Sequence, residues 1–183
     1  MTGSEKDKML AGELYRASDP ELVGERRRCR SLLQAFNSEP EEEQRLELLR
    51  ELLGSVGAGA FVQPPFGCDY GYNVSIGDNV FVNFNAVILD CAPVRIGDGT
   101  QVGPGVQLLA ADHPRDPRTR RDLLELARPI SIGSNVWLGA AAVVLPGVSV
   151  GDDSIVGAGS VVTRDIPGGV LAVGNPCRLV REL

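Results

Sequence analysis

Aliphatic residues recur every six positions through the last two-thirds of this chain. One register holds Ile76, Val82 and Ile88. After a two-residue shift, a second register is made of Ile96, Val102, Leu108, Ile132, Leu138, Val144, Val150, Val156 and Val162. A six-residue period fits neither the 3.6-residue period of a helix nor the alternation of a hairpin strand. A short, regular period is typical of stacked units that bury their apolar sides against their neighbours.

The six-residue period predicts a triangular column of stacked coils. Three repeats, about 18 residues, complete one coil, with one short strand and one corner in each repeat. Gly, Asn and Asp, which tolerate a positive φ or a close backbone approach, stand at the corners. The alternative is an ordinary β-sandwich, which needs turns every 8–12 residues or so rather than every six.

The chain divides into three parts around this column. We expect a mainly β protein with a parallel β-helix over residues 58–169, an N-terminal helical cap over 1–57 and a C-terminal capping tail over 170–183. Residues 114–131 lack the repeat but span one coil's length, which predicts a loop that leaves the stack. The two caps are expected to cover the exposed strand edges at the ends of the column, since such edges favour aggregation.

Local signals predict helices within the cap. Residues Lys6–Tyr15 favour a short helix, and Asp19 followed by Pro20 is typical of a helix start. Ser38 and Glu41 fit a capping box before a further helix.

Composition narrows the classes of protein. The 183 residues carry a net charge of −6, which argues against a nucleic-acid or membrane surface. The charged runs at 25–30 and 41–43 are more typical of solvated helix faces than of binding patches. No apolar run is long enough to cross a bilayer, and the first ten residues lack the apolar centre of a secretory signal.

The cysteines indicate the compartment. Four are scattered without CxxC spacing, so neither a disulfide framework nor a zinc ribbon is expected: Cys29, Cys68, Cys91 and Cys177. We therefore expect reduced thiols, a cytoplasmic protein and no metal site.

His113 is the only histidine of the chain and the first candidate for chemistry. It ends the repeat that begins at Leu108, where the chain leaves the stack. Imidazole is the side chain best matched to proton transfer near neutral pH. A lone histidine carries no mechanism by itself, and a loop histidine that caps a carbonyl is the alternative.

Other polar residues stand where the repeat favours small or apolar ones. Asn83 and Asn85 fit corner positions or an amide ladder, and Asp90 ends a strand. Asp69, before the first regular repeat, and Glu125, inside the loop, have no place that spacing alone assigns.

Two features suggest a binding surface. Trp137 occupies an outward position, and a large exposed aromatic favours a cover such as a subunit interface or a flat ligand. Arg164, Arg178 and Arg181 form a positive cluster suited to a phosphate-bearing ligand, unless they pair with nearby carboxylates.

Several segments together resemble the hexapeptide-repeat acyltransferases, in particular the maltose/galactoside O-acetyltransferase group. They are MLAGELYRASDPEL (9–22), NFN (83–85), ILD (88–90), HP (113–114), PISIGSNVWLGA (129–140), PGVSVGDDSIVGAGSVVTRDIP (146–167) and GNPCRLVRE (174–182). The resemblance implies a left-handed column, an exception to the usual right-handed crossover. It also implies a homotrimer with active sites between subunits.

The resemblance implies an acetyl-coenzyme A-dependent transfer to a hydroxyl of a sugar. His113, the histidine of the HP pair, is the expected general base, and it is expected to face Asn83, Asp90 and Asp69 of a neighbouring subunit. These three residues are the expected acceptor-binding groups, and Glu125 is expected to orient the imidazole or contact the acceptor. The hydroxyl attacks the thioester directly, and no acyl-enzyme is expected.

The family pattern also implies a coenzyme A site. The pantetheine arm is expected to pass Trp137, Gly139, Gly157 and Ala158, and a backbone N–H at the Gly139–Ala140 corner is a candidate oxyanion donor. The nucleotide end is expected to meet Thr163, Arg164 and Arg178.

Two departures from the group put the acceptor in doubt. Cys91 stands where some galactoside-specific members carry an aspartate, and Ala17 stands where some carry an acid. The loop is also unusually basic, through Arg115, Arg118, Arg120 and Arg121. A xenobiotic acetyltransferase and a non-catalytic trimeric module on the same scaffold are the alternatives. A γ-type carbonic anhydrase needs about three zinc-binding imidazoles per site, against one histidine per chain.

Overall fold

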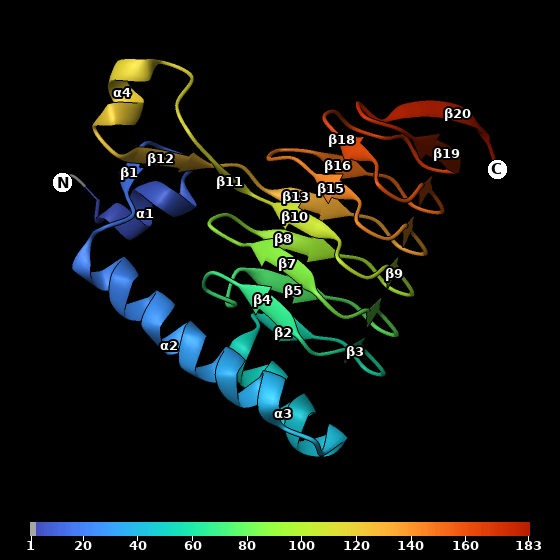
Figure 1. Cartoon of the computed structure of the whole chain (residues 1–183), viewed down its shortest axis with the longest axis horizontal. Helices are drawn as coiled ribbons and strands as arrows, with labels where there is room; N and C mark the ends of the chain where they lie inside the picture. Colours follow the sequence, from blue (N-terminus) through green and yellow to red (C-terminus); the bar gives the residue numbers. More distant parts are fainter. Residues whose placement is uncertain (1–2) are drawn as a thin grey trace.

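The computed structural model describes residues 3–183. A helical cap of α1 (Glu5–Leu10), α2 (Pro20–Ser38) and α3 (Glu42–Leu52) lies against one end and one side of a column of short parallel strands (Figure 1). The short strand β1 (Tyr15–Arg16) lies between α1 and α2. Within the described residues, no helix is long and apolar enough to cross a membrane.

The column has three sheets. The first is β2 (Ser55–Val56), β5 (Val74–Ile76), β8 (Val94–Ile96), β13 (Ile130–Ile132) and β16 (Ser149–Val150). The second is β3 (Phe61–Val62), β6 (Phe81–Val82), β9 (Gln101–Val102), β14 (Trp137–Leu138), β17 (Ile155–Val156), β19 (Val170–Val173) and β20 (Arg178–Glu182). The third is β4 (Phe66–Cys68), β7 (Ala86–Leu89), β10 (Gln107–Leu109), β15 (Val143–Val144) and β18 (Val161–Val162). The chain visits the three sheets in turn, which makes a parallel β-helix.

The six-residue period is confirmed as the register of the column. In the first sheet, Ile76 pairs with Ile96, Ile96 with Ile132, and Ile132 with Val150. All four side chains are buried, as are those of the other repeat positions. Burying an aliphatic side chain of this size contributes about 1.5–3 kcal/mol relative to exposure. The stacked repeat positions are therefore the core.

Small residues are required where coils lie close together. A Cβ added at Gly139 would stand 2.5 Å from the backbone nitrogen of Ala158 on the next coil. Asn85 and Asn135 adopt positive φ values of 61° and 54° at corners, a conformation that asparagine tolerates better than most residues.

The helical cap confirms one predicted helix start and corrects another. Asp19 caps α2 by accepting a hydrogen bond from the backbone of Glu21, with Pro20 as the first helical residue. The capping box at Ser38 is wrong, because Ser38 is the last residue of α2 and its hydroxyl donates to a carbonyl of the preceding turn. A capping box forms instead at Ser4, before α1, which ends at Leu10.

Two boundaries of the column differ from the sequence prediction. β2 already belongs to the first coil, because Val56 pairs with Ile76, although the cap was expected to extend to residue 57. The segment expected as a loop over 114–131 is an ordered excursion of β11 (Ala111–Asp112), α4 (Pro117–Arg121) and β12 (Leu124–Ala127). Ile130 and Ile132 are buried in the stack, so the excursion rejoins the column before residue 131.

The C-terminal tail is half coil and half return strand. β19 pairs in parallel with β17 and so continues the second sheet, and β20 then folds back antiparallel on β19. The tail thus closes the end of the column that lies away from the helices (Figure 1).

Candidate active site

The excursion holds His113 at one corner of the column. β11 continues from β10 at the corner between the third and first sheets, and β12 returns beside it and also pairs with β1. Asp112 fixes the backbone there: it accepts the N–H of His113 at 2.8 Å and pairs with Arg128 at 2.8 Å and with Arg115. Burial raises the pKa of Asp112, but Arg128, the His113 N–H and Arg115 more than offset it and hold the pKa below its usual value.

A cavity of about 320 Å³ opens beside His113, and we call it the inner cavity. The cap, the coils and the excursion each supply part of its wall. It is lined by Tyr15, Ala17, Arg26, Asp69, Tyr70, Leu89, Cys91, Ala111, His113 and Glu125. The mixture of carboxylates, phenols, a guanidinium and an imidazole suits a small ligand rich in hydrogen-bonding groups.

The inner cavity contains three of the predicted site residues in one chain. His113, Asp69 and Glu125 all line it, whereas Asp69 was expected to face the histidine of a neighbouring subunit. Cys91, one of the departures from the group, points its thiol at a carboxylate oxygen of Asp69, 3.5 Å away. Ala17, the other departure, also lines the wall, so both substitutions alter the cavity directly.

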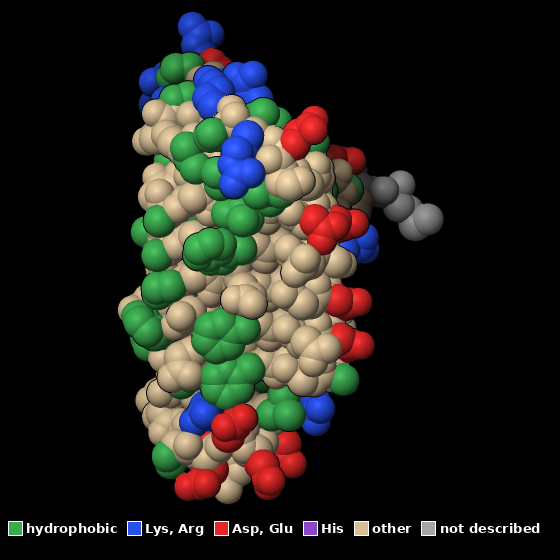
Figure 2. Space-filling view, turned by 90° about the vertical axis from the view of Figure 1, so that its right-hand side faces the viewer, with side chains coloured by type: hydrophobic (Ala, Val, Ile, Leu, Met, Phe, Trp, Pro, Cys, Tyr) green, Lys and Arg blue, Asp and Glu red, His purple; other side chains and the backbone are tan. Residues whose placement is uncertain are grey.

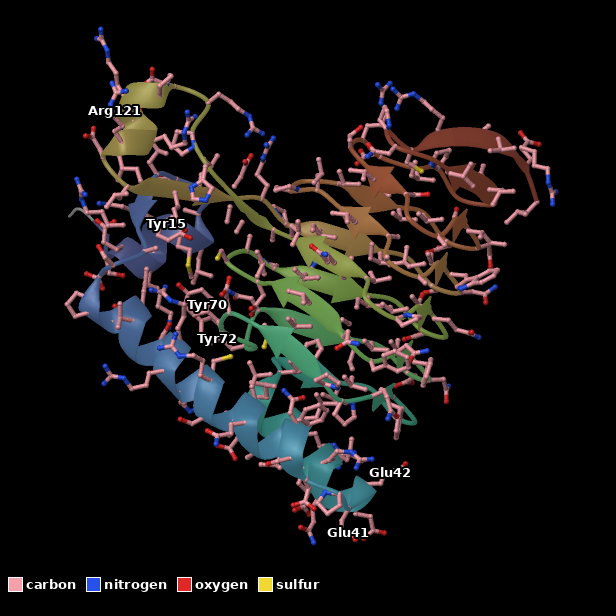
Figure 3. The ribbon with its side chains drawn as sticks, in the orientation of Figure 1. Tyr15, Glu41, Glu42, Tyr70, Tyr72 and Arg121 are labelled. Carbon is pink, nitrogen blue, oxygen red and sulfur yellow. The ribbon has the colours of Figure 1, made fainter. Side chains whose placement is uncertain are left out.

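Hydrogen bonds order the polar wall. The hydroxyl of Tyr15 donates to Glu125 at 3.1 Å, and burial raises the pKa of Tyr15, which keeps the phenol protonated as a donor. Arg26 donates to the hydroxyl of Tyr70 and to the carbonyl of Ala17. Figure 3 shows Tyr15 and Tyr70 in the space between the helical cap and the column.

Asp90 lies beneath the inner cavity and does not line it. Its side chain is fully buried, and its carboxylate accepts the backbone N–H groups of Asp69 at 3.0 Å, Tyr70 at 2.9 Å and Asn73 at 3.3 Å. Burial raises its pKa to about 6, although the N–H groups of Tyr70 and Asp69 act in the opposite direction. Asp90 was expected to bind the acceptor. In this position it instead holds the backbone that presents Asp69.

A second cavity, of about 240 Å³, adjoins the excursion, and we call it the outer cavity. It is lined by His113, Arg120, Leu123 and Glu125. His113 and Glu125 thus belong to both cavities.

The opposite corner, between the second and third sheets, contains most of the residues expected to bind coenzyme A. Trp137 is 54% exposed on β14. It lies in the outward column of the second sheet with Phe61, Phe81 and Ile155. Figure 2 shows hydrophobic side chains exposed along one face of the column. Asn83, Gly139, Ala140, Gly157 and Ala158 follow β6, β14 and β17 at this corner.

The hydrogen bonds of this corner narrow the oxyanion candidates. The N–H of Gly139 donates to the carbonyl of Val156 at 2.7 Å, so it is used by the stack. Of the two residues named, Ala140 therefore remains the candidate donor.

One chain does not bring all predicted groups together. Thr163 and Arg164 follow β18, at the corner between the third and first sheets, and Arg178 begins β20. His113 and Trp137 lie at the two different corners that flank the third sheet.

Among residues 3–183, no three His, Cys, Asp or Glu side chains are grouped so that they could hold a metal ion.

The sequence did not lead us to predict the polar side chains that the helical cap contributes to the wall of the inner cavity. Arg26 belongs to the charged run assigned to solvent, but it points at Tyr70, and its neighbour Glu25 accepts a hydrogen bond from Tyr72. The signal was present: Leu22, Arg26 and Cys29 share one face of α2 by helical spacing. Tyr15 and Tyr70 had no comparable signal, because both stand outside the periodic segments.

A parallel β-helix of six-residue repeats, with a helical cap and a histidine-bearing excursion, defines the class of hexapeptide-repeat acyltransferases. Residues 8–57 match the model of the maltose acetyltransferase hexapeptide capping motif. Residues 73–110 and 129–164 match the model of the hexapeptide repeat of succinyl-transferase. The chain belongs to the maltose/galactoside O-acetyltransferase family.

Individual relatives agree along the full chain. Nodulation protein L of Rhizobium meliloti (strain 1021) is 52% identical over 181 residues, covering 98% of this chain and 99% of that protein. The crystal structure of a maltose O-acetyltransferase from Clostridium difficile 630 is 44% identical, with a TM-score of 0.98 and coverage of 100% of this chain and 99% of that one. A hexapeptide-repeat acetyltransferase from Vibrio cholerae O1 biovar eltor, complexed with acetyl-coenzyme A, is 40% identical with a TM-score of 0.93, covering 99% of each chain.

These matches confirm the predicted left-handed parallel β-helix and the enzyme class. The protein is an acetyl-coenzyme A-dependent O-acetyltransferase, with acetyl-coenzyme A as its co-substrate.

Proposed function

We propose that this enzyme transfers the acetyl group to a hydroxyl of a sugar or sugar-like acceptor bound in the inner cavity, with His113 as the general base. The observation that carries this proposal is the composition of the cavity. The only histidine of the chain stands beside Asp69, Glu125 and Arg26, which can accept from and donate to the hydroxyls of one small ligand.

An alcohol is a weak nucleophile at neutral pH, so it needs a base that removes its proton. His113 removes the hydroxyl proton as the oxygen attacks the thioester carbonyl, and the same proton then passes to the departing thiolate of coenzyme A. General base catalysis of this kind contributes typically about 10²–10⁴-fold. The developing oxyanion needs a backbone donor, for which Ala140 is our candidate.

We further propose that the complete site forms between subunits of a homotrimer. His113 lies at one corner of the third sheet and Trp137 at the other, so a neighbouring chain must bring its own Asn83 and Trp137 to this histidine. The exposed outward column of the second sheet supports such a partner, because large exposed aromatic groups favour a cover.

The remaining predicted residues receive roles by position. Asp69 and Glu125 bind acceptor hydroxyls, Asn83 of the neighbour completes that set, and Asp90 is a positioning residue. The donor passes the small residues of the opposite corner, namely Gly139, Ala140, Gly157 and Ala158. Thr163, Arg164 and Arg178 meet the phosphates of its nucleotide end.

A panel of acceptors with acetyl-coenzyme A tests the reaction. We expect thiol release with hydroxylated sugars, no release without an acceptor, and acetyl esters in the products. Turnover confined to xenobiotic alcohols would identify the alternative substrate class. The absence of turnover with every hydroxyl acceptor would contradict the proposal and favour a non-catalytic module.

The cytoplasmic location stays a prediction. All four cysteines are free, including Cys29 and Cys68, whose sulfur atoms lie 3.6 Å apart, which is consistent with a reducing compartment. Fractionation of the source cells tests it, and recovery outside the cytoplasm would contradict it.

A further inference from the structure

Helix α4 of the excursion ends on a residue that is unfavourable there. Asp122 is its C-cap, and Leu123 follows with a φ of 58°, its N–H donating to the carbonyl of Arg120 at 3.1 Å. This left-handed position after a helix is usually occupied by glycine and sometimes by asparagine. A leucine there is strained, because its side chain crowds the backbone in that conformation.

The side chain of Leu123 gains no packing that offsets this strain. It is 75% exposed, more than any other large hydrophobic residue among residues 3–183. Leu123 thus combines a strained left-handed backbone with an exposed apolar side chain, and no intramolecular contact offsets either cost. A residue of this kind indicates a functional position. A ligand that covers the leucine would remove the unfavourable exposure.

Leu123 faces the reaction site. It lines the outer cavity with Arg120, and this cavity shares His113 and Glu125 with the inner cavity. One guanidinium nitrogen of Arg120 donates to the carbonyl of Pro114 at 3.0 Å, which holds the side chain against the excursion. Because the two cavities share the lining residues His113 and Glu125, a ligand whose reacting ring fills the inner cavity can extend past His113 towards one apolar and one cationic side chain.

We propose that Leu123 determines acceptor specificity by packing on the part of the acceptor beyond the reacting sugar ring. This inference rests on the proposed function and deepens it: the preferred acceptor carries a second ring or an alkyl or aryl substituent. The carbon face of that unit covers Leu123, and an oxygen on it can accept a hydrogen bond from Arg120.

Two substitutions at Leu123 separate this role from a structural one. Leu123→Asn removes the apolar surface but tolerates the left-handed backbone, whereas Leu123→Met keeps an apolar side chain. The acceptors are glucose, maltose and phenyl β-glucoside, each with saturating acetyl-coenzyme A. Leu183→Ser, which alters an exposed apolar residue outside both cavities, is the control.

We expect the wild-type enzyme to favour maltose and phenyl glucoside over glucose. Leu123→Asn should raise KM for these two acceptors roughly tenfold, with kcat retained and the KM for glucose unchanged. Its Tm should rise by about 2–4 °C, because the backbone strain is relieved. Leu123→Met and Leu183→Ser should keep the wild-type preference.

The contrary results are equally specific. An equal change in KM for all three acceptors, or none, would overturn the inference while leaving the acetyl transfer proposal intact. A lower Tm or a dissociated trimer in Leu123→Asn would mean that a neighbouring subunit, not the acceptor, covers the leucine. Failure of the wild-type enzyme to acetylate any hydroxyl acceptor would remove the proposed function and this inference together.

Discussion

The two corners that flank the third sheet are built in different ways. At the corner of Trp137 and Gly139 the repeat runs uninterrupted, and small residues let the coils stack closely. At the corner of His113 the repeat is broken by the excursion, the cap helices approach, and a buried carboxylate organises the backbone. A regular corner gives a smooth, extended surface, whereas an interrupted corner gives a cavity. We assign the first to the long donor and the second to the small acceptor.

The largest effect is expected when the imidazole at the interrupted corner is removed. His113→Ala should lower kcat about 10²–10⁴-fold because the base is lost, while the fold persists because the side chain is exposed. Steady-state kinetics and thermal unfolding measure the two effects. Arg121→Ala is the matched control, since Arg121 lies at the tip of the excursion (Figure 3) and should retain activity. Near-normal turnover of the alanine variant would show that the base is elsewhere.

A second test concerns the buried carboxylate that supports the interrupted corner. Asp90 has a pKa of about 6 in the folded protein, above the ordinary value of 3.8. Between about pH 4 and 6 the folded state therefore binds the extra proton, so stability due to this group falls as pH rises through that window. A shift of this size corresponds to roughly 2–3 kcal/mol.

Unfolding free energies of the wild type and Asp90→Asn, measured from pH 4 to 7, isolate this contribution. The advantage of the wild type over the variant should shrink as pH rises to about 6 and stay level above it. A difference that does not vary with pH would show that Asp90 keeps an ordinary pKa.

The regular corner should respond with a smaller, donor-specific effect. Trp137→Ala removes an aromatic surface that is 54% exposed. We expect KM for acetyl-coenzyme A to rise about tenfold, because roughly one aromatic contact with the donor is lost. The KM for the acceptor should stay unchanged. An effect on the acceptor alone would place Trp137 on the other side of the reaction.

The sequence predicted the regular corner better than the interrupted one. The aliphatic repeat determines which side chains point inward and where the corners fall, so the positions of Trp137 and Gly139 follow from counting. The roles of Asp90 and Arg26 depend on which face of a strand end or helix meets another element. Charge and spacing alone do not reveal that, because a buried, hydrogen-bonded ion looks like a solvated one in sequence.

The excursion shows the same limit. The break in the six-residue repeat after His113 predicted where the excursion leaves the column. Its internal helix and its pairing with β1 were not predicted, because they depend on contacts with the cap. Sequence spacing assigns no place to Asp69 and does not reveal which chain's histidine it meets. The structure puts both in one cavity of one chain.

The central claim is that a complete site takes His113 from one chain and the Trp137 corner from the next. Mixed trimers test it directly, with acetyl-coenzyme A held far below its KM so that the rise in KM lowers turnover: His113→Ala chains are unfolded and refolded together with chains carrying both Asn83→Ala and Trp137→Ala. In a random equal mixture, three trimers in four contain both chains, and each of these has one intact site in three, so about one quarter of wild-type activity should return. If the mixture shows only the mean activity of its two components, the site lies within a single chain and the account is contradicted.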